Sequence, residues 1–133
     1  MNKYLAITTF LGILTIILGA FGAHAFKDIL TPDALKSFET AVRYQMYHVL
    51  FLLFVNTTDS LTILQKNKIN LLILLGILFF SGSIYAITIG GISAKLIWFI
   101  TPLGGLLFIL GWSLLFYFIV TTNKSNNHKS KTQ

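Results

Sequence analysis

The fold is decided by one stretch, which reads Ala41-Val42-Arg43-Tyr44-Gln45-Met46-Tyr47-His48-Val49-Leu50-Phe51-Leu52-Leu53-Phe54-Val55. It has the length and apolar bias of a membrane-spanning segment. Its first half, however, carries polar side chains that lipid does not tolerate without partners: Arg43, Tyr44, Gln45, Tyr47 and His48. Other parts of the protein must cover them. We therefore predict that this stretch is the central helix of a small membrane bundle.

The composition agrees with a membrane protein of one domain. Of 133 residues, 55% are hydrophobic and 11% are charged, and the mean hydropathy is +0.78. The net charge of +6 comes from basic residues scattered over termini and loops, without the interleaved basic and aromatic residues of a nucleic-acid-binding surface. The chain has no cysteine, which excludes disulfides and thiolate metal sites.

Hydropathy and helix-start signals predict an all-α, four-helix integral membrane bundle with short loops, with helices over 4–24, 32–56, 69–89 and 96–120. Thr31-Pro32-Asp33 resembles a helix start, with a hydroxyl cap and a proline in the first turn. Residues 1–122 form the membrane domain, and the tail 123–133, rich in Lys, Asn and Ser, is expected to be disordered.

The first apolar run permits another interpretation. A cleaved signal peptide would also begin with a basic residue, here Lys3, continue with an apolar run and end in a site such as Ala23-His24-Ala25. The apolar run is, however, longer than the ~7–15 residues usual for the apolar segment of a signal peptide. Small residues at helical spacing favour close helix packing, within one chain or across a homo-oligomer. The candidate packing glycines are Gly12, Gly19, Gly22, Gly82, Gly104, Gly105 and Gly111.

Four crossings place both termini on one side of the membrane. That side carries six Lys or Arg residues (Lys3, Lys66, Lys68, Lys124, Lys129, Lys131) and the other carries four (Lys27, Lys36, Arg43, Lys95). The positive-inside rule therefore favours cytoplasmic termini.

All four predicted helices carry polar side chains in the half of the bundle away from the termini. We call this set the polar layer; its residues are His24, Arg43, Tyr44, Gln45, Tyr47, His48, Ser81, Ser83, Tyr85 and Thr101.

Two residues of the polar layer have a structural interpretation beside the functional one. Glu39 precedes Arg43 by four residues, so Arg43 can be an interfacial residue in a helical ion pair. His48 can be a neutral imidazole that a tyrosine hydroxyl or Gln45 satisfies, which holds helices together.

The same residues carry a family resemblance. The chain resembles the domain-of-unknown-function 423 family, which is similar to the eukaryotic transmembrane protein 256. The resemblance rests on Gly19-Ala20-Phe21-Gly22-Ala23-His24, Tyr44-Gln45-Met46-Tyr47-His48, Ser81-Gly82-Ser83-Ile84-Tyr85 and Thr101-Pro102-Leu103-Gly104-Gly105 with Phe108 and Gly111-Trp112. It implies a four-helix protein of the bacterial inner membrane, linked in places to membrane integrity, with no established activity and no catalytic residues to transfer.

Three classes of function follow. The first is a non-enzymatic structural or interaction role in the membrane, with an unknown protein partner. The second is binding or transport of a small ligand or lipid at the polar layer. The third is a haem or metal site on His24 and His48, which lacks the buried carboxylate or third histidine that such a metal site usually needs. Nucleophilic hydrolysis by Ser81 or Ser83 lacks an acid at membrane depth to orient His48, so we assign no catalytic residue.

Overall fold

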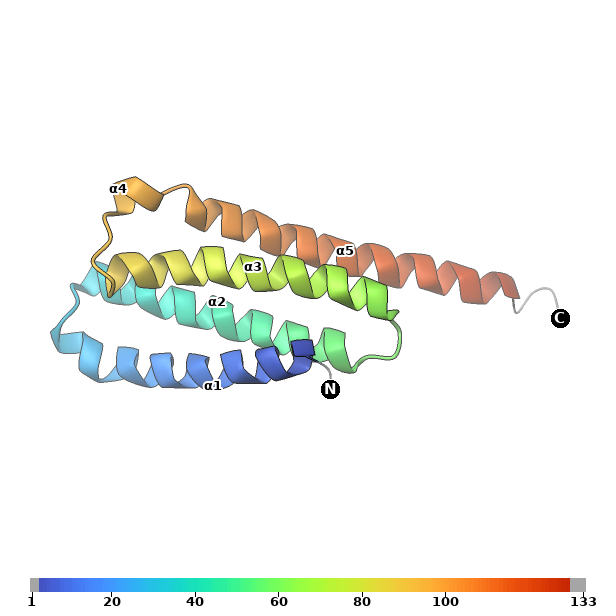
Figure 1. Ribbon diagram of the computed structural model, residues 1–133, viewed down its shortest axis with the longest axis horizontal. Coiled ribbons are helices and arrows are strands. Elements are labelled where there is room, and N and C mark those ends of the chain that lie inside the picture. The colour runs from blue at the N-terminus through green and yellow to red at the C-terminus, as the bar shows by residue number, and fades with distance from the viewer. Residues whose placement is uncertain (1–2, 130–133) are drawn as a thin grey trace.

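The computed structural model describes residues 3–129, with side chains through residue 121. Within that part every regular element is a helix. It forms α1 (Lys3–Ala23), the 3-10 helix η1 (Ala25–Asp28), α2 (Pro32–Thr57), α3 (Ile63–Thr88), the short α4 (Ala94–Ile97) and α5 (Ile100–Lys129). The four long helices lie side by side, and the start of α1 and the end of α5 lie toward the same end of the molecule (Figure 1).

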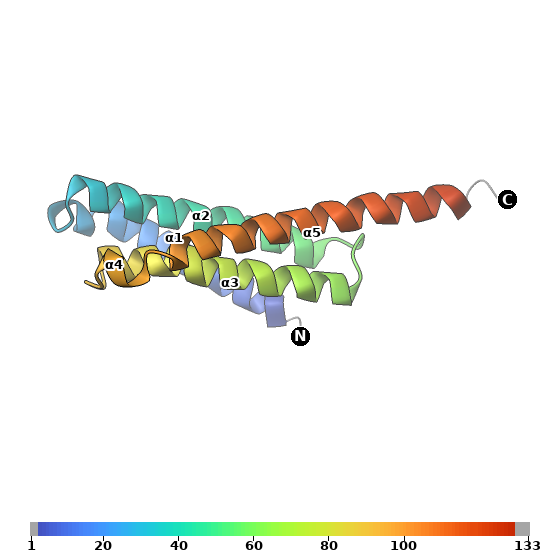
Figure 2. The same ribbon diagram turned by 90° about the horizontal axis from the view of Figure 1, so that it is seen from above.

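The long helices pack in chain order, α1 on α2, α2 on α3 and α3 on α5. Figure 2 shows α5 crossing over the α2 and α3 layer at an angle. Because α2 has neighbours on two sides, it holds some of the most deeply buried apolar side chains, among them Phe38, Leu52 and Val55. Helix α2, which contains residues 41–55, is therefore an inner helix of the bundle, and so is α3, which packs on α2 and α5.

Within residues 3–129, three helices are long and apolar enough to cross a membrane: α1, α3 and the part of α5 from Ile100 to Thr121. Helix α2 does not reach that hydropathy, because Arg43, Gln45 and His48 interrupt its apolar run.

Helix α2 starts as the sequence predicts. Pro32 is the first helical residue, and the Thr31 hydroxyl accepts a hydrogen bond from the Ala34 amide at 3.3 Å.

Helix α3 starts earlier than predicted, at Ile63 rather than near residue 69. A reciprocal capping box causes the difference: the Gln65 amide donates to the Thr62 hydroxyl at 3.3 Å, and the Thr62 amide donates to the Gln65 side chain at 2.9 Å. This cap allows the polar segment around Lys66 to be helical.

The predicted helix over 96–120 is wrong at both ends. Its start is divided into α4 and α5, because Pro102 has no amide proton and its ring would clash with the Trp98 carbonyl of a continuous helix. At the other end α5 continues through Lys129, past the expected start of the disordered tail at residue 123. No proline or glycine interrupts residues 112–129, and each added residue gains a backbone hydrogen bond. Residues 130–133 of that tail lie outside the described part.

The glycines of α1 face α2. A Cβ at Gly22 would lie 3.0 Å from the Phe38 ring, and at Gly12 and Gly19 it would meet Val49 and Val42 at 3.4 and 3.5 Å. The small residues of α1 are therefore used for packing within the chain.

The glycines of α5 differ from one another. A Cβ at Gly104 would overlap the backbone nitrogen of Phe80, and one at Gly111 would come within 2.6 Å of Ile73, so both positions let α5 approach α3 closely. In contrast, a Cβ at Gly105 would meet only the Phe80 ring, at 3.8 Å, and one at Gly82 only Leu78 of its own helix, at 3.8 Å. The packing prediction thus fits Gly104 and Gly111 but not Gly82 and Gly105.

Candidate functional site

Gln45 is the point where three helices of the polar layer meet. Its side chain is 2% exposed. Its Oε1 accepts a hydrogen bond from the Tyr85 hydroxyl of α3 at 3.0 Å, and its Nε2 donates to the Leu11 carbonyl of α1 at 3.4 Å. The amide of α2 therefore links both neighbouring helices.

Two serines of α3 extend the same network. Ser81 donates to the Ala41 carbonyl of α2 at 2.8 Å, and Ser83 shares a 2.6 Å hydrogen bond with Thr101 of α5. Both serines are buried. Each of these bonds joins two helices, which is the use of polar groups expected where water is absent.

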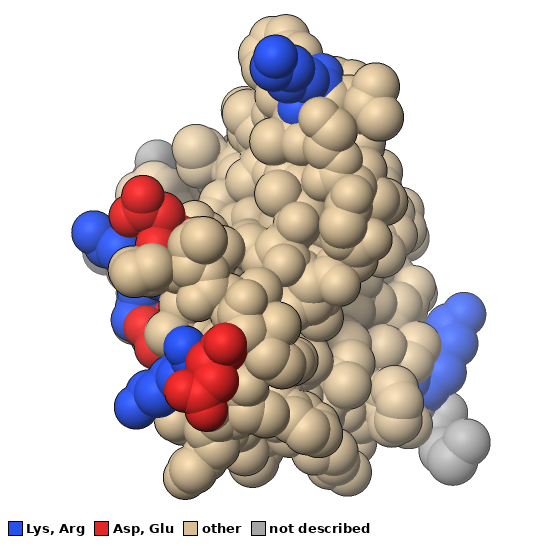
Figure 3. All heavy atoms as spheres, turned by 90° about the vertical axis from the view of Figure 1, so that its left-hand side faces the viewer, with Lys and Arg blue, Asp and Glu red and all other residues tan. Residues whose placement is uncertain are grey.

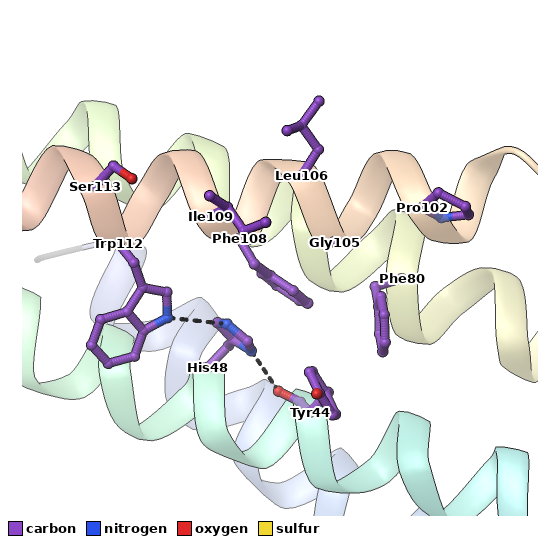
Figure 4. Close-up of a pocket in the computed structure, with 10 residues that line it drawn as sticks. All are labelled: Tyr44, His48, Phe80, Pro102, Gly105, Leu106, Phe108, Ile109, Trp112 and Ser113. Carbon is purple, nitrogen blue, oxygen red and sulfur yellow. Dashed lines mark hydrogen bonds between the residues drawn. The ribbon is translucent and has the colours of Figure 1, made fainter.

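His48 is held on three sides. Nδ1 lies 2.7 Å from the Tyr44 carbonyl, Nε2 accepts from the Trp112 indole at 3.4 Å, and the ring stacks on Phe108 with centroids 3.5 Å apart and planes 8° apart (Figure 4). A carbonyl can only accept and an indole N–H can only donate, so we infer a neutral imidazole with its proton on Nδ1. The partners differ from the expected tyrosine hydroxyl or Gln45, but the structural interpretation of a satisfied imidazole fits.

A groove of about 780 Å³ lies beside this histidine, between α2 and α5. It forms because both helices pack on α3, while aromatic rings span the space between them: His48 on Phe108, and Phe51 on Trp112 with centroids 4.2 Å apart. Figure 4 shows its lining, which is mainly apolar: Tyr44, His48, Phe80, Pro102, Gly105, Leu106, Phe108, Ile109, Trp112 and Ser113.

Four residues of the polar layer lie outside the buried network, and one of them is Tyr44 at the groove, which is 41% exposed. Tyr47 is 57% exposed, and Arg43 is exposed and donates to the Thr40 hydroxyl at 3.2 Å rather than pairing with Glu39. His24 is exposed at the start of η1, with Nδ1 3.2 Å from the Ala20 carbonyl. The polar layer is therefore divided into a buried network and an exposed rim.

The haem option on His24 and His48 does not fit this geometry. His24 follows Gly22, which packs on Phe38, whereas His48 lies ten residues, or about 15 Å, further along α2 than Phe38. Both ring nitrogens of His48 are already engaged. Across the described residues, no three His, Cys, Asp or Glu side chains gather as a metal site would require.

Sequence reasoning missed a second buried polar contact, near the terminal end of the bundle. Asn56 of α2 and Asn70 of α3 exchange amide hydrogen bonds of 2.8 and 3.0 Å, and they are 8% and 0% exposed. Asn56 also donates to Leu52, and Asn70 to Lys66, within their own helices. The predicted helix over 32–56 ends at Asn56, so no buried contact was expected there. A lone asparagine at residue 70 inside an apolar run was the available signal.

Most charges at the opposite end gather on one side of the molecule. Figure 3 views that end, where acidic and basic side chains cluster beside a largely uncharged surface. The charged residues of η1 and the first half of α2 are Lys27, Asp28, Asp33, Lys36, Glu39 and Arg43.

Comparisons with known proteins place this arrangement in a family context. A family model described as protein of unknown function (DUF423) matches residues 18–105. A UPF0382 membrane protein of Haemophilus influenzae is 42% identical, over 87% of this chain and 92% of its own length. A UPF0382 membrane protein of Staphylococcus haemolyticus is 42% identical, over 80% of this chain and 83% of its own length. The UPF0382 membrane protein YwdK of Bacillus subtilis is 35% identical, over 86% of this chain and 94% of its own length. No solved structure matches significantly.

Proposed function

This chain belongs to the family of proteins of unknown function DUF423, and from that membership and its paired polar side chains we propose a non-enzymatic integral membrane protein with a structural or interaction role. The observation that carries the proposal is how completely the buried polar groups are hydrogen-bonded, several of them between helices. Within the described residues, no buried side-chain nitrogen or oxygen lacks a hydrogen-bond partner. Polar groups engaged in this way hold helices together in lipid.

The proposal includes a fourth crossing by α2. Its 26 residues are about 39 Å long, enough for the ~30 Å hydrocarbon layer, and it lies between α1 and α3, both of which are candidate spans. Gln45 and His48 are buried, while Leu50 and Phe54 are more than half exposed. This is the pattern of a helix that presents apolar side chains to lipid and polar ones to protein.

Single cysteines can test the fourth crossing, since the natural chain has none. Asp33→Cys lies in the first turn of α2, and Asp59→Cys lies two residues after its other end. With cytoplasmic termini in the bacterial inner membrane, a membrane-impermeant maleimide should label Asp33→Cys in intact cells and Asp59→Cys only after permeabilisation. Leu50→Cys, inside the span, should resist labelling in both. Labelling of Asp33→Cys and Asp59→Cys from the same side would refute the crossing.

The structural role can be tested by measuring membrane permeability in bacterial cells from which this protein has been deleted. We expect greater uptake of a membrane-impermeant dye, restored by the wild-type chain. Across variants such as Ser83→Ala, Tyr85→Phe and Gln45→Leu, restoration should follow the amount of folded protein in the membrane. A variant that is folded at wild-type level but fails to restore the barrier would instead indicate chemistry at the polar layer.

A further inference from the structure

We propose that the groove between α2 and α5 binds one molecule of an anionic glycerophospholipid, with an acyl chain along the groove and the phosphate at Arg43. This rests on the proposed function in one respect, since both helices must lie in the bilayer. The volume of about 780 Å³ falls within the ~300–1,000 Å³ of typical small-ligand sites, and the lining is mainly apolar. An acyl chain suits such a lining.

Tyr44 supplies a hydrogen bond at the rim of the groove. Its ring is fixed by stacking on Phe80, with centroids 4.8 Å apart and planes 28° apart. Among the described side chains its hydroxyl has no hydrogen-bond partner, although the residue is on a helix that we place in the membrane. A hydroxyl without a partner in hydrocarbon is unfavourable. A lipid ester carbonyl is an acceptor that would satisfy it.

The depth of Tyr44 fits an ester group. The contact between Gly19 and Val42 places this part of α2 about one turn inside the end of α1 at Ala23. Side chains on a helix lean toward its N-terminus, which for α2 is the nearby end of the bundle. The Tyr44 hydroxyl is therefore directed toward the membrane interface, where ester groups lie.

Arg43 precedes Tyr44 in the sequence and supplies a positive charge near the groove, although it does not line the groove itself. Its guanidinium bonds to the hydroxyl of Thr40, which lies one helical turn from Tyr44 toward the interface and on nearly the same face. Its side chain is exposed, and among the described side chains it forms no ion pair, although Glu39 lies one turn away on the same helix. Lys36 lies one further turn along. This charge is complementary to a phosphate, because the remaining guanidinium donors match phosphate oxygens.

The combination favours a lipid over a protein occupant. A partner helix or a second copy of this chain would cover the apolar lining, but it would need its own acceptor for Tyr44 and its own acid for Arg43. One anionic lipid supplies an acyl chain for the apolar lining, an ester carbonyl for Tyr44 and a phosphate for Arg43, in that order toward the membrane interface.

The experiment is native mass spectrometry of the full chain in mild detergent, with added dioleoylphosphatidylglycerol or, separately, dioleoylphosphatidylcholine. We expect the wild type to retain one phosphatidylglycerol. Arg43→Gln and Tyr44→Phe should each lower the retained fraction about fivefold, the loss expected for one basic side chain or one hydrogen bond. Tyr47→Phe removes a similarly exposed hydroxyl outside the groove and should change nothing.

A second variant fills the groove without touching the polar groups. Gly105 lines the groove and has room for a Cβ, so Gly105→Leu should fold and displace the lipid. Gly82→Leu adds the same bulk away from this groove and serves as the control. Circular dichroism and cysteine labelling of the same variants report folding and the α2 crossing separately, so loss of this site is distinguishable from failure of the membrane topology.

Three results would overturn the proposal: no lipid retained by the wild type, equal retention by Gly105→Leu, or equal retention of the two lipids with no effect of Arg43→Gln. A retained mass equal to a second copy of this chain, lost in Gly105→Leu, would assign the groove to dimerisation instead.

Discussion

The buried pair of Asn56 and Asn70 gives the sharpest test of how this bundle is held together. We predict that replacing either asparagine with leucine costs more than replacing both. A single replacement leaves the remaining amide with one donor and one acceptor unpaired in a buried site, which costs about 1–3 kcal/mol. Its other hydrogen bond, within its own helix, remains.

The double replacement should be milder. It removes two interhelical hydrogen bonds, worth about 0.6 kcal/mol each in membranes, but it strands no buried polar group. Leucine branches at Cγ as asparagine does, but its methyl groups need a wider separation than the 2.8 and 3.0 Å between the amides, so part of the double loss comes from repacking. With single losses near 2 kcal/mol and a double loss near 1 kcal/mol, the coupling between the two sites is about 3 kcal/mol, at the upper end of the range for directly bonded pairs.

The assay is unfolding by sodium dodecyl sulfate in mixed micelles, followed by circular dichroism. Asn67→Leu is the matched control, since Asn67 lies on the same helix but is exposed, and it should change the free energy of unfolding by less than about 0.5 kcal/mol. A double variant that loses as much as the sum of the single variants would show that the two amides act independently, and the reasoning would fail.

Three further predictions use other contacts. Gly104→Ala should destabilise the bundle by about 1–3 kcal/mol, because its methyl group overlaps the α3 backbone, while Gly105→Ala should be nearly neutral in the same unfolding assay. Ser83→Ala should cost about 0.6 kcal/mol through the lost bond to Thr101, and an effect above about 3 kcal/mol would mean that the serine does more than bridge two helices. Of two reporters fused after Gln133, one that works only in the cytoplasm should be active and one that works only in the periplasm should be inactive, whereas the opposite result would invert the orientation.

The sequence was sufficient for the elements that depend on local chemistry. An apolar run with polar residues at helical spacing indicated that α2 is an inner helix, and Thr31-Pro32 fixed where it begins. The start of α3 was equally local, because Thr62 and Gln65 form a capping box readable from the sequence. It was missed because the polar residues around Lys66 suggested a loop. The break at Pro102 likewise follows from proline chemistry alone.

Partner identity could not be predicted, because it depends on how helices are rotated against one another. The level of Gln45 in the membrane was evident from the sequence, but its bond to Tyr85 depends on the angle between α2 and α3. The angle between α3 and α5 depends in the same way on close contacts such as Gly76 against Phe108, where a Cβ would come within 2.6 Å of the ring. Contacts of this kind join residues far apart in the chain, and one sequence carries no record of them.

The same dependence explains why the polar layer divides. Residues 44, 45, 47 and 48 occupy one stretch of α2, but the helix turns by about 100° per residue, so they face different neighbours. Gln45 faces α1 and α3, and His48 faces the rings of α5, so both are buried. Tyr47 faces outward, and Tyr44 lies at the groove between these directions. Burial assigns the first two to holding the bundle together, and exposure leaves Tyr44, with Arg43 next to it in the sequence, as the groups able to meet a lipid.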